Sequence, residues 1–245
     1  MPAVTFDVLL IVFVATLIRS AFGFGEALIA VPLLTLFIPL QVAAPLAVLL
    51  SITVAGIVVA QDWRQIHVRS AGWLVSSTLF GIPAGLMLLT STHQQAVKIA
   101  LAILIVAFST YSLVGRRPPE LNSDHRAWLL GCGFCAGVLG GAYGMNAPPL
   151  VMYGAMRRWS AQHFRATLQA YFLPASTLGM AGFWAAGLWT PRVTHYYLIS
   201  LPAAVLAVFL GRLINRRFRG DRFLKYVYVG LIATGALLFL QTIRG

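Results

Sequence analysis

Acidic side chains are scarce in this chain, which has six Asp and Glu residues among 245. An enzyme that works by acid–base or metal chemistry needs carboxylates and histidines gathered in one place. Glu26 is the one carboxylate inside an apolar stretch, and the five histidines are scattered at segment ends. A membrane-embedded enzyme is therefore the least favoured functional class, and no cofactor or metal is expected. The other acidic residues stand in expected loops or near the N-terminus: Asp7, Asp62, Glu120, Asp124 and Asp221.

Long polar segments are also missing, which excludes a separate aqueous domain. Hydrophobic residues make up 59% of the chain and charged residues 10%, a balance that lipid solvates and water does not. The formal net charge of +12 comes from Lys and Arg in short loops, so the chain has no soluble face to follow nucleic-acid phosphates. The sequence predicts a single all-α membrane domain, 1–245, that contacts the lipid bilayer and no nucleic acid.

Cysteine is nearly absent, which argues against a metal site. The two cysteines, Cys132 and Cys135, form a CxxC pattern inside an apolar run, and two thiols alone do not hold a metal. Gly133, Gly137 and Gly141 follow at four-residue spacing, which is typical of closely packed membrane helices. We therefore expect both cysteines to be small packing residues, with a redox or sulfur-relay role as the alternative.

Apolar runs and their breakers divide the chain into ten segments. Six of them are long enough to cross a hydrocarbon core, which requires about 20 residues. Segments 26–38 and 147–157 are too short, and each follows a Gly-rich break. The ten segments are 5–22, 26–38, 42–60, 71–89, 96–114, 127–142, 147–157, 163–187, 194–214 and 223–241.

The two breaks reveal an internal repeat. Residues 21–34 (AFGFGEALIAVPLL) align with residues 142–155 (AYGMNAPPLVMYGA), so that Gly25 pairs with Asn146. Three full-length segments follow each break. We therefore expect repeat one at 1–115, a polar linker at 116–126 and repeat two at 127–245.

Basic residues predict how the repeats are oriented, because cytoplasmic loops carry an excess of Lys and Arg. All basic loops fall on one face only if 5–38 and 127–157 each enter the membrane and return on the same side. The repeats are then inverted, each a broken-helix hairpin plus three transmembrane helices, in the cell inner membrane with both termini outside. The basic loops are 61–70, 115–126, 157–165 and 212–225, whereas 38–42 and 90–95 carry no Lys or Arg.

The hairpin tips are the predicted substrate site, because a chain break at membrane depth must be buried in protein or line a wet cavity. Each short helix begins just after its break, so its free N–H groups and positive dipole end point at the tip and favour an anion. Close helix packing is the alternative role for the glycines. Asn146 could donate to an anion or cap its own helix. The candidate tip residues are Gly23, Phe24, Gly25, Gly144, Met145 and Asn146.

Glu26 and Arg19 are the candidate proton-coupling pair. A protonated Glu26 could couple proton movement to transport, and Arg19 lies seven residues upstream on the other hairpin arm, where it could neutralise the carboxylate. A static Arg19–Glu26 ion pair is the alternative.

Arg165 and Gln169 are further substrate-binding candidates at the start of a long span. Thr167 lies between them, and a spacing of two residues does not place all three side chains on one helical face. Arg165 could instead be an interfacial anchor, whereas a buried Gln169 needs a partner or a ligand. Ser51 and Thr53, in the corresponding span of the first half, are weaker candidates because hydroxyls can bond to their own helix.

The chain resembles the TauE/SafE sulfite exporter family, which includes permease-like anion transporters for compounds such as 4-toluene sulfonate. The resemblance rests on Gly23–Leu34, where the family usually has GFGGG followed by Pro, and on residues 140–144 and 164–168 in the second half. It implies a secondary transporter of a small sulfur-containing anion such as sulfite, a sulfonate or thiosulfate, driven by an ion gradient. Glu26 stands where the family often has glycine, so selectivity or proton coupling should differ. An anion channel is the main alternative, and assembly into a homo-oligomer stays open.

Overall fold

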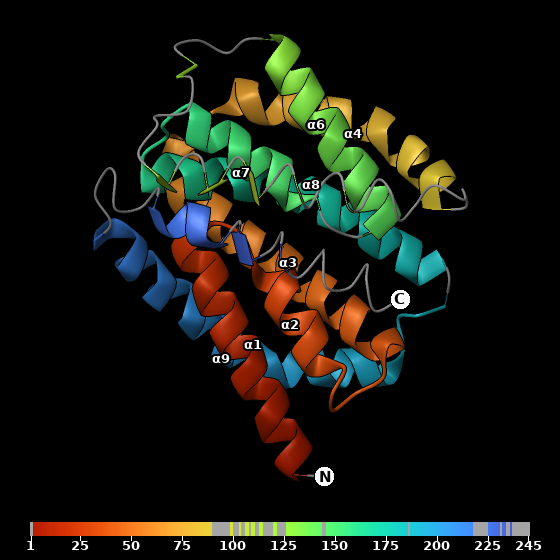
Figure 1. Ribbon diagram of the computed structural model, residues 1–245. Coiled ribbons are helices and arrows are strands. Elements are labelled where there is room, and N and C mark those ends of the chain that lie inside the picture. The colour runs from red at the N-terminus through yellow and green to blue at the C-terminus, as the bar shows by residue number, and fades with distance from the viewer. Residues whose placement is uncertain are drawn as a thin grey trace. The chain divides into compact units, whose positions relative to one another are not determined.

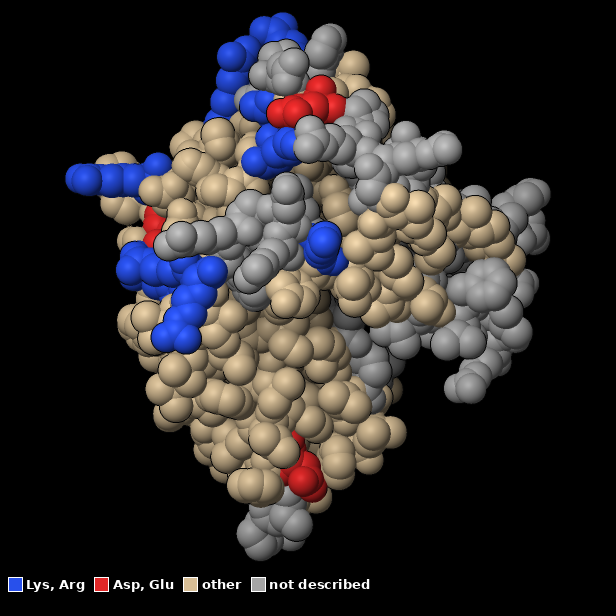
Figure 2. All heavy atoms as spheres, turned by 60° about the vertical axis from the view of Figure 1, so that its left-hand side comes forward, with Lys and Arg blue, Asp and Glu red and all other residues tan. Residues whose placement is uncertain are grey.

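The computed structural model is all-helical (Figure 1), with no strand among the residues it describes. These residues are 2–89, 120–121, 126–143, 146–185, 187–217 and 225–230, with isolated positions between 99 and 114 and between 232 and 236. The predicted segments 96–114 and 223–241 lie largely outside them. Much of the surface visible in Figure 2 is uncharged, and the Lys and Arg side chains gather in a few patches.

The described helices begin and end within a few residues of the predicted segments. The clearest difference is the end of α2, which stops at Leu34 because Thr35 and the residues after it turn towards Pro39. A residue that precedes proline is disfavoured in helical conformation. The elements are α1 (Pro2–Phe22), α2 (Glu26–Leu34), α3 (Leu40–Asp62), the 3₁₀ turn η1 (Trp63–Gln65), α4 (Val68–Leu89), α6 (Arg126–Tyr143), α7 (Ala147–Met156), α8 (Ala161–Ala185) and α9 (Pro191–Arg217).

Three helices in the described part of the chain are long and apolar enough to cross a membrane: Val4–Phe22, Gln41–Gln65 and Pro191–Arg217. The last two fall on predicted full-length spans. The first is α1, the expected entering arm of the first hairpin, which by length and composition could cross a membrane. The other predicted spans stay predictions. Among them, α8 has the length of a span but carries His163, Arg165 and Gln169 in its first half.

The chain divides into two compact units, each described by itself. Unit 1 comprises residues 1–71 and 161–217. In it α1 packs along α9, α3 packs along α8 and α9, and the short α2 folds back against α1 and α3. The apolar core of this unit includes Val12, Leu46, Leu50 and Val193.

Unit 2 comprises residues 72–160 and 218–245. Its α6 packs against α4 through glycines, because a Cβ atom on Gly137 would lie 2.3 Å from the carbonyl oxygen of Thr78 and 2.9 Å from the Cα of Gly81. The Thr78 hydroxyl donates to the carbonyl oxygen of Gly133 at 2.8 Å. The expected packing role of the α6 glycines is confirmed at Gly133 and Gly137. Cys132 and Cys135 are free thiols on the same helix.

Candidate functional site

The break between α1 and α2 is a turn of three residues, and two of them are glycines in the left-handed conformation. Gly23 has φ 89° and Gly25 has φ 98°, values that other residues adopt only with strain. Helix α1 ends at Phe22 and α2 begins at Glu26, as the sequence predicts. Gly25 occupies the N-cap position of α2 without a side-chain cap bond, so the first N–H groups of α2 are left to other partners.

Because Gly23 has no side chain, the turn packs closely against α8. A Cβ atom on Gly23 would lie 3.1 Å from the Cα of Arg165 and 3.5 Å from atoms of Phe164 and Leu168. Gly25 has space beside it, since the one atom near its Cβ position is a methyl carbon of Ile18 at 3.8 Å. The open side of the turn is therefore at Gly25.

Phe24, also predicted to bind substrate, packs into the protein. Its side chain is buried and makes an edge contact with Phe164, with ring centroids 6.4 Å apart. This contact fixes the turn on α8, so the side chain of Phe24 serves packing in this conformation. Its backbone remains part of the turn.

Arg19 is the centre of a buried polar network. Its side chain is 5% exposed, and all five N–H donors of its guanidinium have acceptors. One donor binds the carboxylate of Glu26, and two bind the Gln169 side-chain oxygen at 2.8 and 3.1 Å. The remaining two bind Ser51, one its hydroxyl at 2.7 Å and one its carbonyl oxygen at 3.5 Å. The guanidinium also lies over the ring of Phe172, 5.1 Å from its centroid.

Glu26 is paired across the hairpin, as one of the two sequence interpretations predicts. Its carboxylate forms a buried ion pair with Arg19 and accepts a hydrogen bond from the Thr16 hydroxyl at 3.2 Å. The pair is electrically neutral as a whole, which lowers the high cost of burying either charge alone. A proton-coupling role for the pair stays a prediction.

Gln169 joins the network to the turn. Its amide nitrogen donates to the carbonyl oxygen of Gly23 at 3.0 Å while its oxygen accepts from Arg19. The buried amide has the partner that the sequence analysis requires, and that partner is the protein itself. Gln169 lies about 12 Å along α8 from Ala161 at 1.5 Å per residue.

Two serines complete the network, and one of them was not a candidate in the sequence. The hydroxyls of Ser51 and Ser176 lie 2.7 Å apart. Ser51 is the central residue of α3, so the last turn of α1 and the first turn of α2 meet α3 at its middle. Ser176 was missed because nothing in an apolar helix distinguishes an exposed serine from one that faces a neighbouring helix.

Arg165 belongs to a second polar cluster at the helix ends. Its Nη1 forms an ion pair with Asp62, and its Nε donates to the carbonyl oxygen of Ser20 at 2.6 Å. Asp62 also accepts from Arg212 at 3.1 Å. Arg165 and Gln169 both face the hairpin, whereas Thr167 accepts from the backbone N–H of His67. Thr167 therefore faces the α3–α4 connection and not the hairpin.

The second predicted tip lies in unit 2. Asn146 is the N-cap residue of α7 by position but makes no side-chain cap bond, and its Cβ packs beside Gly140. Pro148 and Pro149 follow in the first turn and remove two N–H donors from this helix start, so it offers fewer donors than α2 does. Gly144 and Met145 lie outside the described residues. That the two turns face one another stays a prediction.

Metal chemistry finds no support in the described part of the chain, where no three His, Cys, Asp or Glu side chains gather closely enough to hold an ion. The arrangement that the described residues do offer is a buried guanidinium, hydroxyls, an amide and a free helix start beside a glycine turn. These are ligands for an oxyanion.

A family model described as sulfite exporter TauE/SafE matches residues 8–238. No curated protein and no solved structure matches the chain.

Proposed function

The chain belongs to the TauE/SafE sulfite exporter family, and from this premise we propose that it is a secondary transporter of a small sulfur-containing anion. The family is one of membrane anion exporters rather than enzymes. The proposed substrates are sulfite, a sulfonate or thiosulfate. The proposed location is the cell inner membrane, with both termini outside.

The observation that carries the proposal is the Arg19 network beside the Gly23–Gly25 turn. A buried guanidinium beside the middle of a membrane helix is costly unless it has a function or a partner. The start of α2 supplies a positive dipole end at the same turn. Gly25 leaves room beside this helix start, so an oxyanion can approach backbone and side-chain donors together.

The carboxylate of Glu26 is bound to the Arg19 guanidinium, the group that such an anion needs. Because every donor of Arg19 already has an acceptor, an anion binds there only after the carboxylate of Glu26 has moved or been neutralised. A proton on Glu26 would release Arg19 and supply a hydroxyl donor in place of a competing charge. Anion binding and proton binding then favour each other, which is the physical basis of proton coupling.

Inverted repeats are proposed for the fold, and the helix contacts support them. Under the alignment of the two breaks, α1 corresponds to α6, α3 to α8 and α4 to α9. The corresponding helices α3 and α8 pack on one another, a contact that is compatible with an exchange of the two repeats. Helices α1 and α9 pack together in unit 1, and their counterparts under the alignment, α6 and α4, pack together in unit 2. Inverted repeats with broken helices are a frequent architecture of secondary transporters.

An anion channel is the competing function. A channel passes ions without a conformational cycle, whereas a carrier exchanges labelled for unlabelled substrate across the membrane. The buried, fully paired Arg19 favours a carrier, because an ion that moved past it at channel rates would have to break the Arg19–Glu26 pair at each passage.

The test is a binding and exchange experiment with the purified full chain. Binding is measured as the rise in unfolding temperature on addition of sulfite, thiosulfate, a sulfonate, acetate or phosphate. The compound that binds best is then loaded, in labelled form, into vesicles that contain the protein. We expect a sulfur oxyanion to bind best, and unlabelled substrate outside the vesicle to accelerate loss of label. Arg192→Gln is the control for loss of a positive charge and should bind and exchange substrate as the unsubstituted protein does. Arg192 is an exposed residue at the start of α9, where it contacts Tyr196.

Two results would contradict the proposal. Flux that unlabelled substrate does not accelerate would indicate a channel. Preference for acetate or phosphate over every sulfur oxyanion would exclude the substrate class.

A further inference from the structure

The cluster of Arg165, Asp62 and Arg212 begins one helical turn along α8 from Gln169 of the Arg19 network and extends to the end of α3, and the proposed transport site leaves it without a role. Asp62 is the last residue of α3, whereas Ser51 of the Arg19 network is at its centre. Eleven residues of helix separate the two positions, which corresponds to about 16 Å. The first hairpin turn lies between them, since Arg165 donates to Ser20 and Gln169 donates to Gly23.

The cluster has more positive than negative charge, and not all of its hydrogen-bond donors have acceptors. Two guanidiniums share one carboxylate, and the last turn of α9 adds Arg216 and Arg217. Arg165 is 1% exposed, and its Nη2 is buried with no hydrogen-bond partner. A buried donor without an acceptor is rare in proteins and costly in a membrane.

Two neighbours of the cluster repeat this pattern. The side-chain oxygen of Ser20 and both side-chain polar atoms of Gln61 are buried without a partner. The backbones of these residues are held by the same two arginines, because Arg165 donates to the Ser20 carbonyl and Arg212 donates to the Gln61 carbonyl at 3.0 Å. The Ser20 hydroxyl, the Gln61 amide nitrogen and Nη2 of Arg165, on three different helices, thus lack acceptors. They lie beside two arginines that share one carboxylate.

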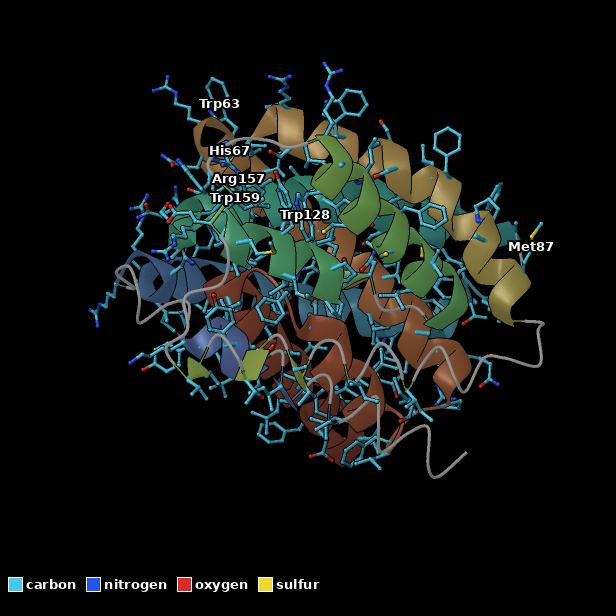
Figure 3. The ribbon with its side chains drawn as sticks, turned by 45° about the horizontal axis from the view of Figure 1, so that its top comes forward. Trp63, His67, Met87, Trp128, Arg157 and Trp159 are labelled. Carbon is cyan, nitrogen blue, oxygen red and sulfur yellow. The ribbon has the colours of Figure 1, made fainter. Side chains whose placement is uncertain are left out.

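Aromatic residues indicate that this end of unit 1 lies at the membrane surface. Trp63 directly follows Asp62 and is 62% exposed, with the guanidinium of Arg64 over its ring at 5.2 Å. Tryptophan and arginine side chains of this kind are typical of the boundary between lipid and water. Figure 3 shows Trp63 and His67 on the connection between α3 and α4, with Met87 near the far end of α4.

We propose that Arg165, Arg212, Gln61 and Ser20 form a second oxyanion site at the basic end of unit 1, where an anion docks before it reaches Arg19. Asp62 is the tethered occupant of this site, and an incoming oxyanion replaces its carboxylate between the two arginines. The inference rests on the proposed function, because a docking site needs a transport site beyond it. Its ligand is a small oxyanion, and the phosphate of an anionic lipid shares that chemistry.

Two substitutions should act in opposite directions on this site. Asp62→Asn removes the competing carboxylate, so the half-saturating sulfate concentration should fall about tenfold, the factor that corresponds to about 1.4 kcal/mol. Arg212→Gln removes a donor and a positive charge, so this concentration should rise by a similar factor. Arg192→Gln, the charge control on the same helix, should leave it unchanged.

The measurement is equilibrium binding of labelled inorganic sulfate to the purified full chain in neutral detergent, together with thermal unfolding. The same titration in vesicles of phosphatidylcholine alone, and with added phosphatidylglycerol, distinguishes the two anion sources. Sulfate binding that is equal in detergent and in phosphatidylcholine supports the docking site. Sulfate binding that added phosphatidylglycerol abolishes would overturn it, because a lipid headgroup would then be the occupant that displaces sulfate.

A purely structural ion cluster predicts a different result. Both substitutions would then lower the unfolding temperature, sulfate would not restore it, and neither would change sulfate affinity. That outcome overturns the docking site even if sulfite exchange persists. Absent sulfite exchange with the opposite shifts intact would instead leave this oxyanion site standing and remove the transport function.

Discussion

At the scale of single residues, Glu26 decides whether anion binding depends on pH. Its carboxylate holds Arg19, so an anion must compete with it while Glu26 is charged. Glu26→Gln keeps the shape and hydrogen-bonding capacity of the side chain and removes the charge. We expect this variant to bind the transported anion at least about tenfold more tightly near neutral pH, a change of about 1.4 kcal/mol.

The pH profile provides the sharper measurement for Glu26. With a sulfonate as the probe, whose charge does not change over this range, affinity for the unsubstituted protein should rise as pH falls, because protonation of Glu26 frees Arg19. In Glu26→Gln the same profile should be flat. Asp7→Asn removes a carboxylate near the start of α1, away from the network, and should keep the original profile. A parallel pH dependence in all three proteins would make Glu26 a structural residue.

The residue scale is also where sequence reasoning loses information. Gly23, Gly25, Glu26 and Arg19 are recognisable because a glycine turn and paired charges are unusual inside apolar segments. The hydroxyls around Arg19 are harder to recognise: Ser51 is only a weaker candidate and Ser176 is missed, since their role depends on which helices pack together. Asp62 appears in the sequence as an ordinary loop carboxylate, and its pairing with two arginines from distant segments is visible only in the fold.

At the scale of elements, the α4–α6 contact depends on the absence of side chains at particular glycines. A Cβ atom on Gly137 would lie 2.3 Å from a backbone oxygen of α4, so the two helices would have to separate. A Cβ atom on Gly131, on the same helix, would meet no other atom within 4 Å. The two positions therefore form a matched pair for the same substitution.

We expect Gly137→Ala to lower the stability of the purified protein by about 1–3 kcal/mol, the usual cost of overpacking. Gly131→Ala should leave stability unchanged or raise it by up to about 1 kcal/mol, because alanine is the better helix former. Thermal unfolding in detergent measures both. Equal effects of the two substitutions would mean that α6 does not approach α4 this closely.

Helix positions were predictable from the sequence because apolar runs and glycine or proline breaks report directly on backbone structure. The pairing of helices was not predictable in the same way. The repeat makes segment 163–187 correspond to segment 42–60, but correspondence does not predict contact, and only the fold shows that α8 and α3 pack together and bring Gln169 and Ser51 to Arg19. Complementary side-chain packing decides such contacts, and it is not local in sequence.

At the scale of the whole molecule, the distribution of basic loops predicts the orientation in the membrane. The loops 61–70, 157–165 and 212–225 carry most of the positive charge, and each adjoins a residue of the Arg165–Asp62–Arg212 cluster or contains one. If these loops are cytoplasmic, the cluster is cytoplasmic too. Arg19 lies in the last turn of α1, so the N-terminus at the other end of this helix is then outside.

Accessibility of inserted tags in intact cells tests this orientation. A tag before Pro2 should react with an impermeant antibody in intact cells, whereas a tag in the linker 116–126 should react only after permeabilisation. In the alternative count the first hairpin crosses the membrane once, so that four crossings separate these positions and place both tags on the same side. Tags that become accessible together would require that count, and the two repeats would then no longer be inverted.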